Sequence, residues 1–246
     1  MSALRDIDGA FAHQAVAMQA AGLGKAYGPI TVLTDVALDI IAGEVHAIIG
    51  ENGAGKSTLM KLLSGHVQPT EGQIFINGEP VDFANAVEAE AVGIVLVHQE
   101  ILLAPDLTVA QNLYLGRELT RGWMVDDRAM NRRTAELLLQ VGSIAHPEDR
   151  VGDLPLAQRQ LVQIARALLN EHKVVILDEP TAVLANDEVE ALLEIVRSLR
   201  KHGVAVLYIS HRLEEVEALA DRITVLRDGR MIGTWPAAGL TQRPMA

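Results

Sequence analysis

Residues 50–58 read GENGAGKST and fit the pattern G-x-x-x-x-G-K-[ST]. Glycines let successive backbone N–H groups turn inward and form a nest for an anion, and a helix starting near Ser57 would present its positive end to the same anion. Lys56 would then reach the β- and γ-phosphates of a nucleotide, and the Ser57 hydroxyl would bind Mg²⁺. An apolar strand before the loop and a helical pattern after it disfavour a chance glycine loop. The predicted phosphate-binding residues are Gly50, Glu51, Asn52, Gly53, Ala54, Gly55, Lys56, Ser57 and Thr58.

A pair of carboxylates follows the apolar run at residues 174–177, in the sequence VVILDEP. Ligands in open α/β sheets bind beyond the carboxyl ends of the strands, which is where this pair would lie. Asp178 is predicted to hold Mg²⁺ through water, and Glu179 to orient or deprotonate an attacking water molecule. Two solvated acids at a strand end are the alternative, which becomes the weaker interpretation beside a phosphate-binding loop.

Alternating and helical patterns indicate the elements that would position these groups. Strands are predicted from Val16, through residues 32–40 and 45–49, and as buried runs at 174–177 and 204–209. Apolar residues have helical spacing at 161–169 and at 189–199, so each of the last two buried runs follows a predicted helix. This is the βαβ rhythm of a parallel sheet. The Asn77–Gly78 and Asp228–Gly229 pairs predict two hairpins. Residues 100–165 are predicted to be a helical insertion between strands.

Composition limits the classes of protein that are possible. The 246 residues are enough for one or one and a half domains, and the net charge of −11 disfavours nucleic acid as the main partner. The lack of cysteine excludes disulfides, cysteine–zinc sites and thiol catalysis. No run approaches the roughly 18 apolar residues of a membrane-spanning helix, and residues 1–15 lack a secretory core. The chain is therefore expected to be cytoplasmic.

With the loop and the carboxylates placed, the remaining landmarks resemble one family, over about residues 17–235. The chain looks like the ATP-binding subunit of an ABC transporter. Tyr27 in GKAYG would stack on adenine, Gln99 in LVHQE would contact Mg²⁺ or water, and His211 in YISHR would contact the γ-phosphate. LPLAQRQ, at residues 154–160, occupies the signature position. No role is assigned to His46 or His98.

The resemblance implies a P-loop NTPase fold of the ABC ATPase type. This is an α/β fold with a mainly parallel core sheet, an antiparallel β-subdomain and an α-helical subdomain at about 100–165. The expected organisation is a tail at 1–15, the ATPase domain at 16–240 and a tail or linker at 241–246. ATP and Mg²⁺ are the expected cofactors. The implied catalytic residues are Glu179, His211, Lys56 and Gln99, and the implied metal-binding residues are Ser57, Gln99 and Asp178.

Within the family, GENGAGKSTLMKLLSG, HQE and LTVAQNLYLGRE look like the monosaccharide importers. These usually carry two ATPase halves in tandem, and an intact loop with an off-pattern signature is typical of the N-terminal half. The resemblance implies uptake of a sugar or polyol through membrane permease subunits, which residues 100–120 would contact. A second ATPase half and, indirectly, a periplasmic solute-binding protein are further implied partners. The expected location is peripheral, on the inner face of the cell membrane.

The signature departs from the family's LSGGQ. Pro155 stands at the serine, which normally donates a hydrogen bond to the γ-phosphate in the opposite domain, and Ala157 stands at the second glycine. Ala185 also replaces an aspartate of many relatives. Pro155 is equally compatible with simply starting a helix at Leu156. A homodimer would then have two poor ATP sites, so little ATPase activity is expected of the chain alone.

Two other functions remain open. A non-transport ABC ATPase that acts on ribosomes or DNA is disfavoured by the acidic charge and by the lack of a long coiled-coil insertion. A degenerate nucleotide-binding module with little hydrolysis is favoured by Pro155 and disfavoured by Glu179. An assay of ATP hydrolysis in the presence of a competent second ATPase half distinguishes the two. A degenerate module would bind ATP without hydrolysing it.

Overall fold

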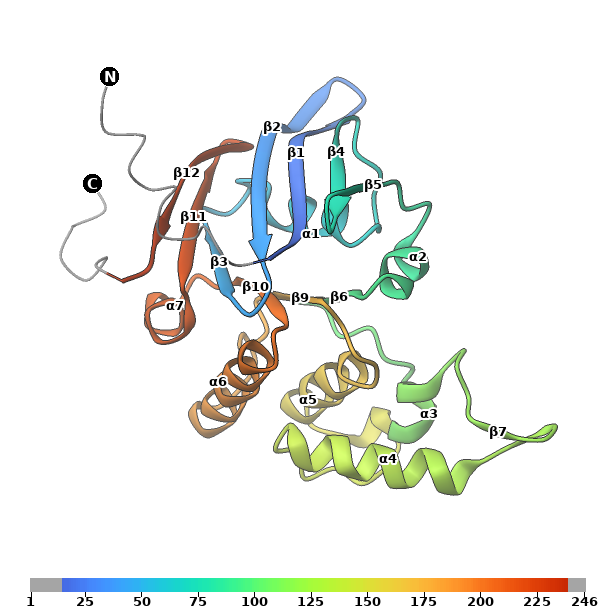
Figure 1. Ribbon diagram of the computed structural model, residues 1–246. Coiled ribbons are helices and arrows are strands. Elements are labelled where there is room, and N and C mark those ends of the chain that lie inside the picture. Colours follow the sequence, from blue (N-terminus) through green and yellow to red (C-terminus); the bar gives the residue numbers. More distant parts are fainter. Residues whose placement is uncertain (1–14, 239–246) are drawn as a thin grey trace, which may run out of the picture.

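A six-stranded sheet forms the centre of the computed structural model, which describes residues 15–238 (Figure 1). Its strands, in spatial order, are β12 (Arg230–Pro236), β11 (Arg222–Arg227), β3 (Val45–Ile49), β10 (Ala205–Ile209), β9 (Val174–Asp178) and β6 (Ile94–Val97). All neighbouring pairs are parallel except β11 with β12, so the expected mainly parallel core sheet is confirmed. The predicted tails at 1–15 and 241–246 lie outside the described residues, apart from residue 15.

Alternate residues of β9 pack into two separate cores. Val175 and Leu177 of β9 face one core, which contains the helices that follow β6 and β9 in sequence. Val174 and Ile176 face the other core, which contains the phosphate-loop helix and the second sheet. Because both faces are covered, the strands are continuous apolar runs without the polar alternation of a half-exposed sheet.

The second sheet is antiparallel. Its strands, in spatial order, are β2 (Ile30–Ile41), β1 (Val16–Tyr27), β4 (Glu71–Ile76) and β5 (Glu79–Val81). The predicted Asn77–Gly78 turn joins β4 to β5, and both residues have positive φ, 50° and 82°. Asp228 and Gly229 join β11 to β12 with φ of 50° and 72°. Both predicted hairpins are confirmed, because Asn-Gly and Asp-Gly pairs tolerate two successive left-handed residues.

Helices cover the sheets, and three of them lie in the segment between β6 and β9. The helices are α1 (Lys56–Leu63), α2 (Ala86–Ala91), α3 (Val109–Tyr114), α4 (Asp127–Gln140), α5 (Leu156–Ala167), α6 (Asn186–Lys201) and α7 (Leu213–Leu219), with a 3₁₀ turn at Val151–Asp153. In Figure 1, α3, α4 and α5 lie together below the central sheet. No helix within residues 15–238 combines the length and the apolar character needed to cross a bilayer.

One element of the helical segment was not expected from the sequence. Strands β7 (Thr120–Arg121) and β8 (Met124–Val125) form a hairpin that projects from α3 and α4 (Figure 1). Its tip carries Trp123, whose side chain is 94% exposed. Strands of two residues are too short to produce a detectable alternation, so the mostly helical pattern of residues 100–165 gave no sign of this hairpin.

A buried carboxylate lies at the start of β3, away from the phosphate loop. Glu44 is 3% exposed, and Arg222 Nε lies 2.8 Å from its Oε1. Burial raises the pKa of Glu44 to about 7, against the opposing effect of Arg222. The folded chain therefore holds this proton more tightly than the unfolded chain does.

A pH-dependent stability follows for Glu44. Between about pH 4.5 and pH 7 the native state binds more protons at this site, so its contribution to the free energy of unfolding falls as the pH rises. The difference in unfolding free energy between wild type and Glu44→Gln should change by about 3 kcal/mol across that range. The wild type should become less stable relative to the variant as the pH rises. Urea titrations of both proteins at several pH values measure it. A constant difference would show that Glu44 does not titrate in this way.

Candidate nucleotide-binding site

The predicted phosphate loop runs from the end of β3 into α1. Gly55 is the N-cap of α1 with φ of 99°, a conformation that favours glycine. A Cβ on Gly55 would lie 2.6 Å from Leu33 Cδ2, and one on Gly50 would lie 2.2 Å from the Leu226 carbonyl oxygen. Both positions therefore require glycine, because other parts of the chain lie too close to leave room for a Cβ atom. Lys56 Nζ donates to the carbonyl oxygens of Gly50 (2.7 Å) and Glu51 (3.0 Å), which holds the ammonium across the loop.

The two carboxylates lie at the carboxyl end of β9, as predicted: Asp178 is its last residue and Glu179 follows. Asp178 is 8% exposed and accepts a hydrogen bond from Ser57. Burial raises the pKa of Asp178, although the bond from Ser57 and the charge of Lys56 oppose the rise. Glu179 has a positive φ of 47°, and its backbone N–H donates to the Ile209 carbonyl at 3.0 Å. The Glu179 side chain lines the cleft described below.

Three segments that are distant in sequence meet at the Glu179 carboxylate. Gln99 Nε2, just after β6, donates to Glu179 Oε2 at 3.4 Å. His211 Nδ1, just after β10, lies 3.5 Å from the same oxygen. The His211 side chain is 64% exposed, against 17% for Glu179. The strand order places β6, β9 and β10 side by side, so the residues after them converge at one edge.

These groups line an open cleft of about 670 Å³. Its lining residues are Val32, Asn52, Gly53, Gly55, Lys56, Ser57, Thr58, Gln99, Glu179 and His211. Tyr27 is not among them: it is 48% exposed at the end of β1, with Lys25 Nζ 5.0 Å from its ring centroid. The cleft thus joins the loop, one carboxylate, an amide and an imidazole, but not the predicted aromatic residue.

A buried carboxylate behind the cleft fixes the segments that follow β9 and β10. Glu215 Oε2, on α7, accepts hydrogen bonds from Thr181 (3.0 Å), Tyr208 (2.9 Å) and Ser210 (2.8 Å). Burial, together with the charge of Glu215, raises the pKa of Tyr208. Thr181 follows the carboxylate pair and Ser210 precedes His211, so Glu215 holds both segments in place. Glu215 gives no signal in the sequence, because an acidic helical residue is normally exposed.

The signature segment begins a helix. Pro155 is the N-cap of α5 with φ of −56°, and the helix starts at Leu156. The predicted role of Pro155 as a helix-starting residue is therefore confirmed. Leu156 is 54% exposed, whereas Ala157 is partly buried against the core of the helical segment. An exposed leucine at this helix start is available to contact another chain.

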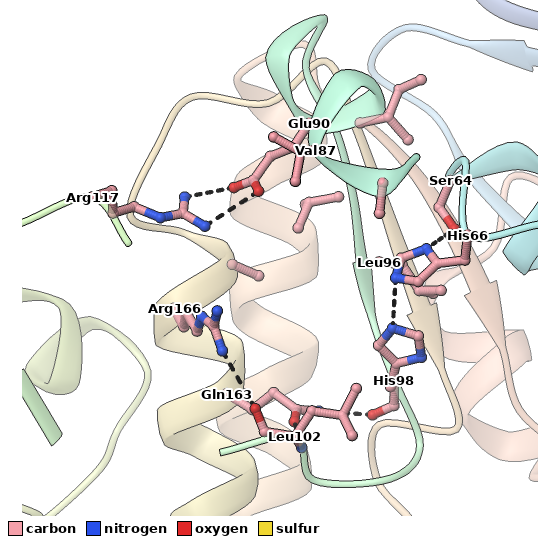
Figure 2. Close-up of a pocket in the computed structure, with 14 residues that line it drawn as sticks. Ser64, His66, Val87, Glu90, Leu96, His98, Leu102, Arg117, Gln163 and Arg166 are labelled. Atoms are coloured by element: carbon pink, nitrogen blue, oxygen red, sulfur yellow. Dashed lines mark hydrogen bonds and ion pairs between the residues drawn. The ribbon is translucent and has the colours of Figure 1, made fainter. Parts of the chain in front are cut away.

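A second pocket of about 390 Å³ lies between α2, β6 and α5 (Figure 2). Arg117 forms a two-pronged ion pair with Glu90 in its wall, with N–O distances of 2.6 and 3.2 Å. Gln163 on α5 accepts from the Leu102 N–H at 2.7 Å and donates to the His98 carbonyl at 2.8 Å. These bonds anchor the chain on both sides of Gln99 to α5.

Two histidines meet in the wall of the second pocket. His66 Nε2 and His98 Nε2 are 3.1 Å apart. Burial lowers the pKa of His66 and of His98, and the neighbouring Lys61 lowers both further. Both effects favour the neutral form of the two rings. Nothing in the order of the sequence indicates this pair, because 32 positions separate the two residues.

The fold and the cleft define a nucleotide-binding cassette, and the comparisons agree. Residues 33–182 match the ABC transporter family, and the chain belongs to that family. A nucleotide-free ATP-binding cassette from an ABC transporter superposes with a TM-score of 0.79 at 25% identity, covering 89% of this chain and 90% of the other. A dimeric cassette bound to ADP and Pi superposes with a TM-score of 0.80 at 26% identity, covering 90% and 99%.

Curated relatives are more similar in sequence. A ribose import ATP-binding protein of Rubrobacter xylanophilus is 49% identical over 221 residues, which are 90% of this chain and 45% of that protein. A ribose import ATP-binding protein of Chelativorans sp. is 48% identical over 228 residues, which are 93% and 44%. The chain thus spans somewhat less than half the length of the curated relatives it matches.

Proposed function

We propose that the chain is the ATP-binding and ATP-hydrolysing subunit of an ABC importer that takes up a sugar or polyol. The observation that carries the proposal is the convergence of Lys56, Ser57, Gln99, Glu179 and His211 on one cleft. Relatives at 48–49% identity are named as ribose import ATP-binding proteins, which supports the substrate class. The domain limits are proposed as ATPase domain at 16–240 with the helical subdomain at about 100–165.

The phosphate loop binds the nucleotide in this proposal. The residues from Gly50 to Thr58 surround the β- and γ-phosphates, and the N-terminus of α1 adds its partial positive charge. Lys56 exchanges its bonds to the loop carbonyls for bonds to phosphate oxygens, which are stronger because both partners are charged. Tyr27, exposed at the end of β1, is proposed to stack on adenine.

Oxygen donors that suit Mg²⁺ meet at the end of β9. Ser57 and Asp178 are in hydrogen-bond contact, and a hydroxyl with a carboxylate is a donor set that this hard cation prefers. The side-chain oxygen of Gln99 is the third proposed ligand. When bound, Mg²⁺ neutralises charge on the β- and γ-phosphates.

Hydrolysis needs a base beside the γ-phosphate and a group that stabilises its charge. Glu179 orients the attacking water and accepts its proton, since its carboxylate reaches the cleft from the end of β9. His211 is proposed to donate to the γ-phosphate, and its exposed ring is placed for this by the Glu215 contacts described above. Gln99, whose Nε2 donates to Glu179, would contact the same water and Mg²⁺.

The proposed partners follow from the exposed surfaces and the relatives. A permease helix would dock in the second pocket, whose wall contains Leu102 and Arg117 from the segment that the sequence analysis assigned to this contact. A second ATPase half would supply an intact signature, and a periplasmic solute-binding protein would act through the permease. The chain would then lie on the inner face of the membrane. A nucleotide-binding half with little hydrolysis of its own is the second candidate, favoured by Pro155.

Binding of ATP tests the first step of the proposal. Lys56→Ala should weaken binding of Mg²⁺–ATP by roughly 10–150-fold, since a hydrogen bond to a charged group contributes about 1.5–3 kcal/mol. Lys201→Ala, at the far end of α6, is the matched control and should bind as the wild type does. Isothermal titration calorimetry of the three proteins measures the affinities. Equal affinities of Lys56→Ala and wild type would refute the assignment of the cleft.

A further inference from the structure

The β7–β8 hairpin carries a run of exposed apolar side chains at its tip. Trp123, Met124 and Val125 are consecutive, and they are 94%, 64% and 49% exposed. Figure 1 shows that the hairpin projects away from α3 and α4. Three consecutive exposed apolar residues are unusual on a soluble protein unless they contact a partner.

Arginines accompany this tip. Arg121 and Met124 form a cross-strand pair, so their side chains lie on the same face of the hairpin. Arg128 and Arg132 are four positions apart near the start of α4 and therefore share one side of that helix. All three arginines are exposed, and no ion pair within residues 15–238 involves them. Their guanidinium groups are therefore available to bind anionic groups.

The charge around the hairpin has the opposite sign to that of the whole chain. Residues 119–133 contain four arginines and two aspartates, which give a local charge of +2, whereas the net charge of the chain is −11. Asp126 accepts a hydrogen bond from the Ala129 N–H at 3.0 Å, and Asp127 lies in the first turn of α4. The N–H groups at the start of this helix partly offset both negative charges. An apolar tip beside cationic residues suits a surface of apolar chains and anionic headgroups.

We propose that the β7–β8 hairpin inserts Trp123 into the headgroup region of a membrane that contains anionic lipids. Tryptophan is enriched at membrane–water interfaces, and arginine binds headgroups while its methylene groups lie along the apolar surface. A lipid surface suits the shape of the hairpin better than a protein does. A stable protein interface takes roughly 20–30 residues from each partner, which is more than a projecting turn supplies.

The position of the hairpin agrees with the proposed docking of a permease helix, and the role of the lipid contact in the cell rests on that proposed function. Arg117, in the wall of the second pocket, lies three residues before β7 begins at Thr120. The hairpin therefore continues from the surface that would contact the permease. A single small apolar anchor binds a bilayer weakly. A docked permease would hold the tip near the bilayer and raise its effective concentration there.

Tryptophan fluorescence of the nucleotide-free chain tests the lipid contact directly. The chain has two tryptophans, so Trp235→Phe leaves Trp123 as the only one. Its emission should shift to shorter wavelength when phosphatidylglycerol vesicles are added, and lipids brominated in the acyl chains should quench it. Phosphatidylcholine vesicles should give a smaller shift. Added salt should reduce the shift with phosphatidylglycerol, because salt screens exposed charges.

Substitutions at the hairpin should weaken binding in proportion to what each side chain supplies. Arg121→Gln and Arg128→Gln should each reduce partitioning into phosphatidylglycerol vesicles by roughly fivefold. Trp123→Gln should reduce it by roughly tenfold or more, because the largest apolar group is lost. Arg230→Gln, exposed at the start of β12, is the matched control and should partition as the wild type does. Sedimentation with vesicles measures the partitioning, and circular dichroism checks that each variant is folded.

Two results would overturn the lipid contact. One is an unchanged emission of Trp123 in the presence of phosphatidylglycerol vesicles, and the other is equal partitioning of Trp123→Gln and the wild type. Neither measurement uses nucleotide or permease, so the outcome is independent of ATP binding. Vesicle binding through Trp123 by a chain that fails to bind Mg²⁺–ATP would refute the proposed function alone. Normal ATP binding without the emission shift would refute the lipid contact alone.

Discussion

Glu179→Gln is expected to lower the rate of ATP hydrolysis by roughly 10²–10⁴-fold, the usual contribution of a general base. The amide keeps the size of the carboxylate and its contact with Gln99, but it cannot accept a proton from water. ATP affinity should therefore remain close to that of the wild type. The rate is measured as phosphate release from the chain assembled with a second ATPase half that carries an LSGGQ signature.

The assembled pair is needed because the signature of this chain is expected to be weak. Glu217→Gln, an exposed position on α7, is the control and should leave the rate unchanged. Full turnover in Glu179→Gln would assign the base to another group. An equal loss of ATP binding would instead show that Glu179 contributes to the binding of the nucleotide.

Replacing two of the three off-pattern signature residues should increase turnover by the chain alone, with Leu156 left at the position of the first glycine. Pro155 begins α5 with φ of −56°, which serine adopts without strain, and serine is a preferred N-cap. The double variant Pro155→Ser, Ala157→Gly supplies the missing hydroxyl and the closer backbone approach. Loss of a single donor to a transition state costs about 10²–10³-fold in rate, so an increase of roughly 10²-fold in homodimer turnover is expected.

The control separates the hydroxyl from the removal of proline. Pro155→Ala, Ala157→Gly also frees the backbone N–H and allows the close approach, but it adds no side-chain donor. Phosphate release at a protein concentration that supports dimers compares the three proteins. If the alanine and serine double variants hydrolyse ATP at the same rate, the hydroxyl is not the missing group. If wild type already turns over rapidly, Pro155 does not impair the site.

Most of the elements around the loop could be predicted because their signals are local. The run GENGAGKST, the two turn pairs Asn77–Gly78 and Asp228–Gly229, and the apolar runs of β9 and β10 each encode their conformation within a few residues. Short-range sterics decide these features, so sequence patterns predict them well. The β7–β8 hairpin escaped prediction because its strands have only two residues each.

Long-range contacts were beyond what periodicity could show. The sequence alone determined the phosphate loop, the carboxylate pair and the family resemblance, because each depends on residue types at fixed spacing. Only the tertiary structure showed that Gln99 and His211 meet at one oxygen of Glu179 and that Glu215 holds three hydroxyls. It also paired His66 with His98 and placed Tyr27 outside the lining of the cleft. The physical reason is that the order of strands in the sheet, rather than the order of residues in the chain, decides which side chains become neighbours.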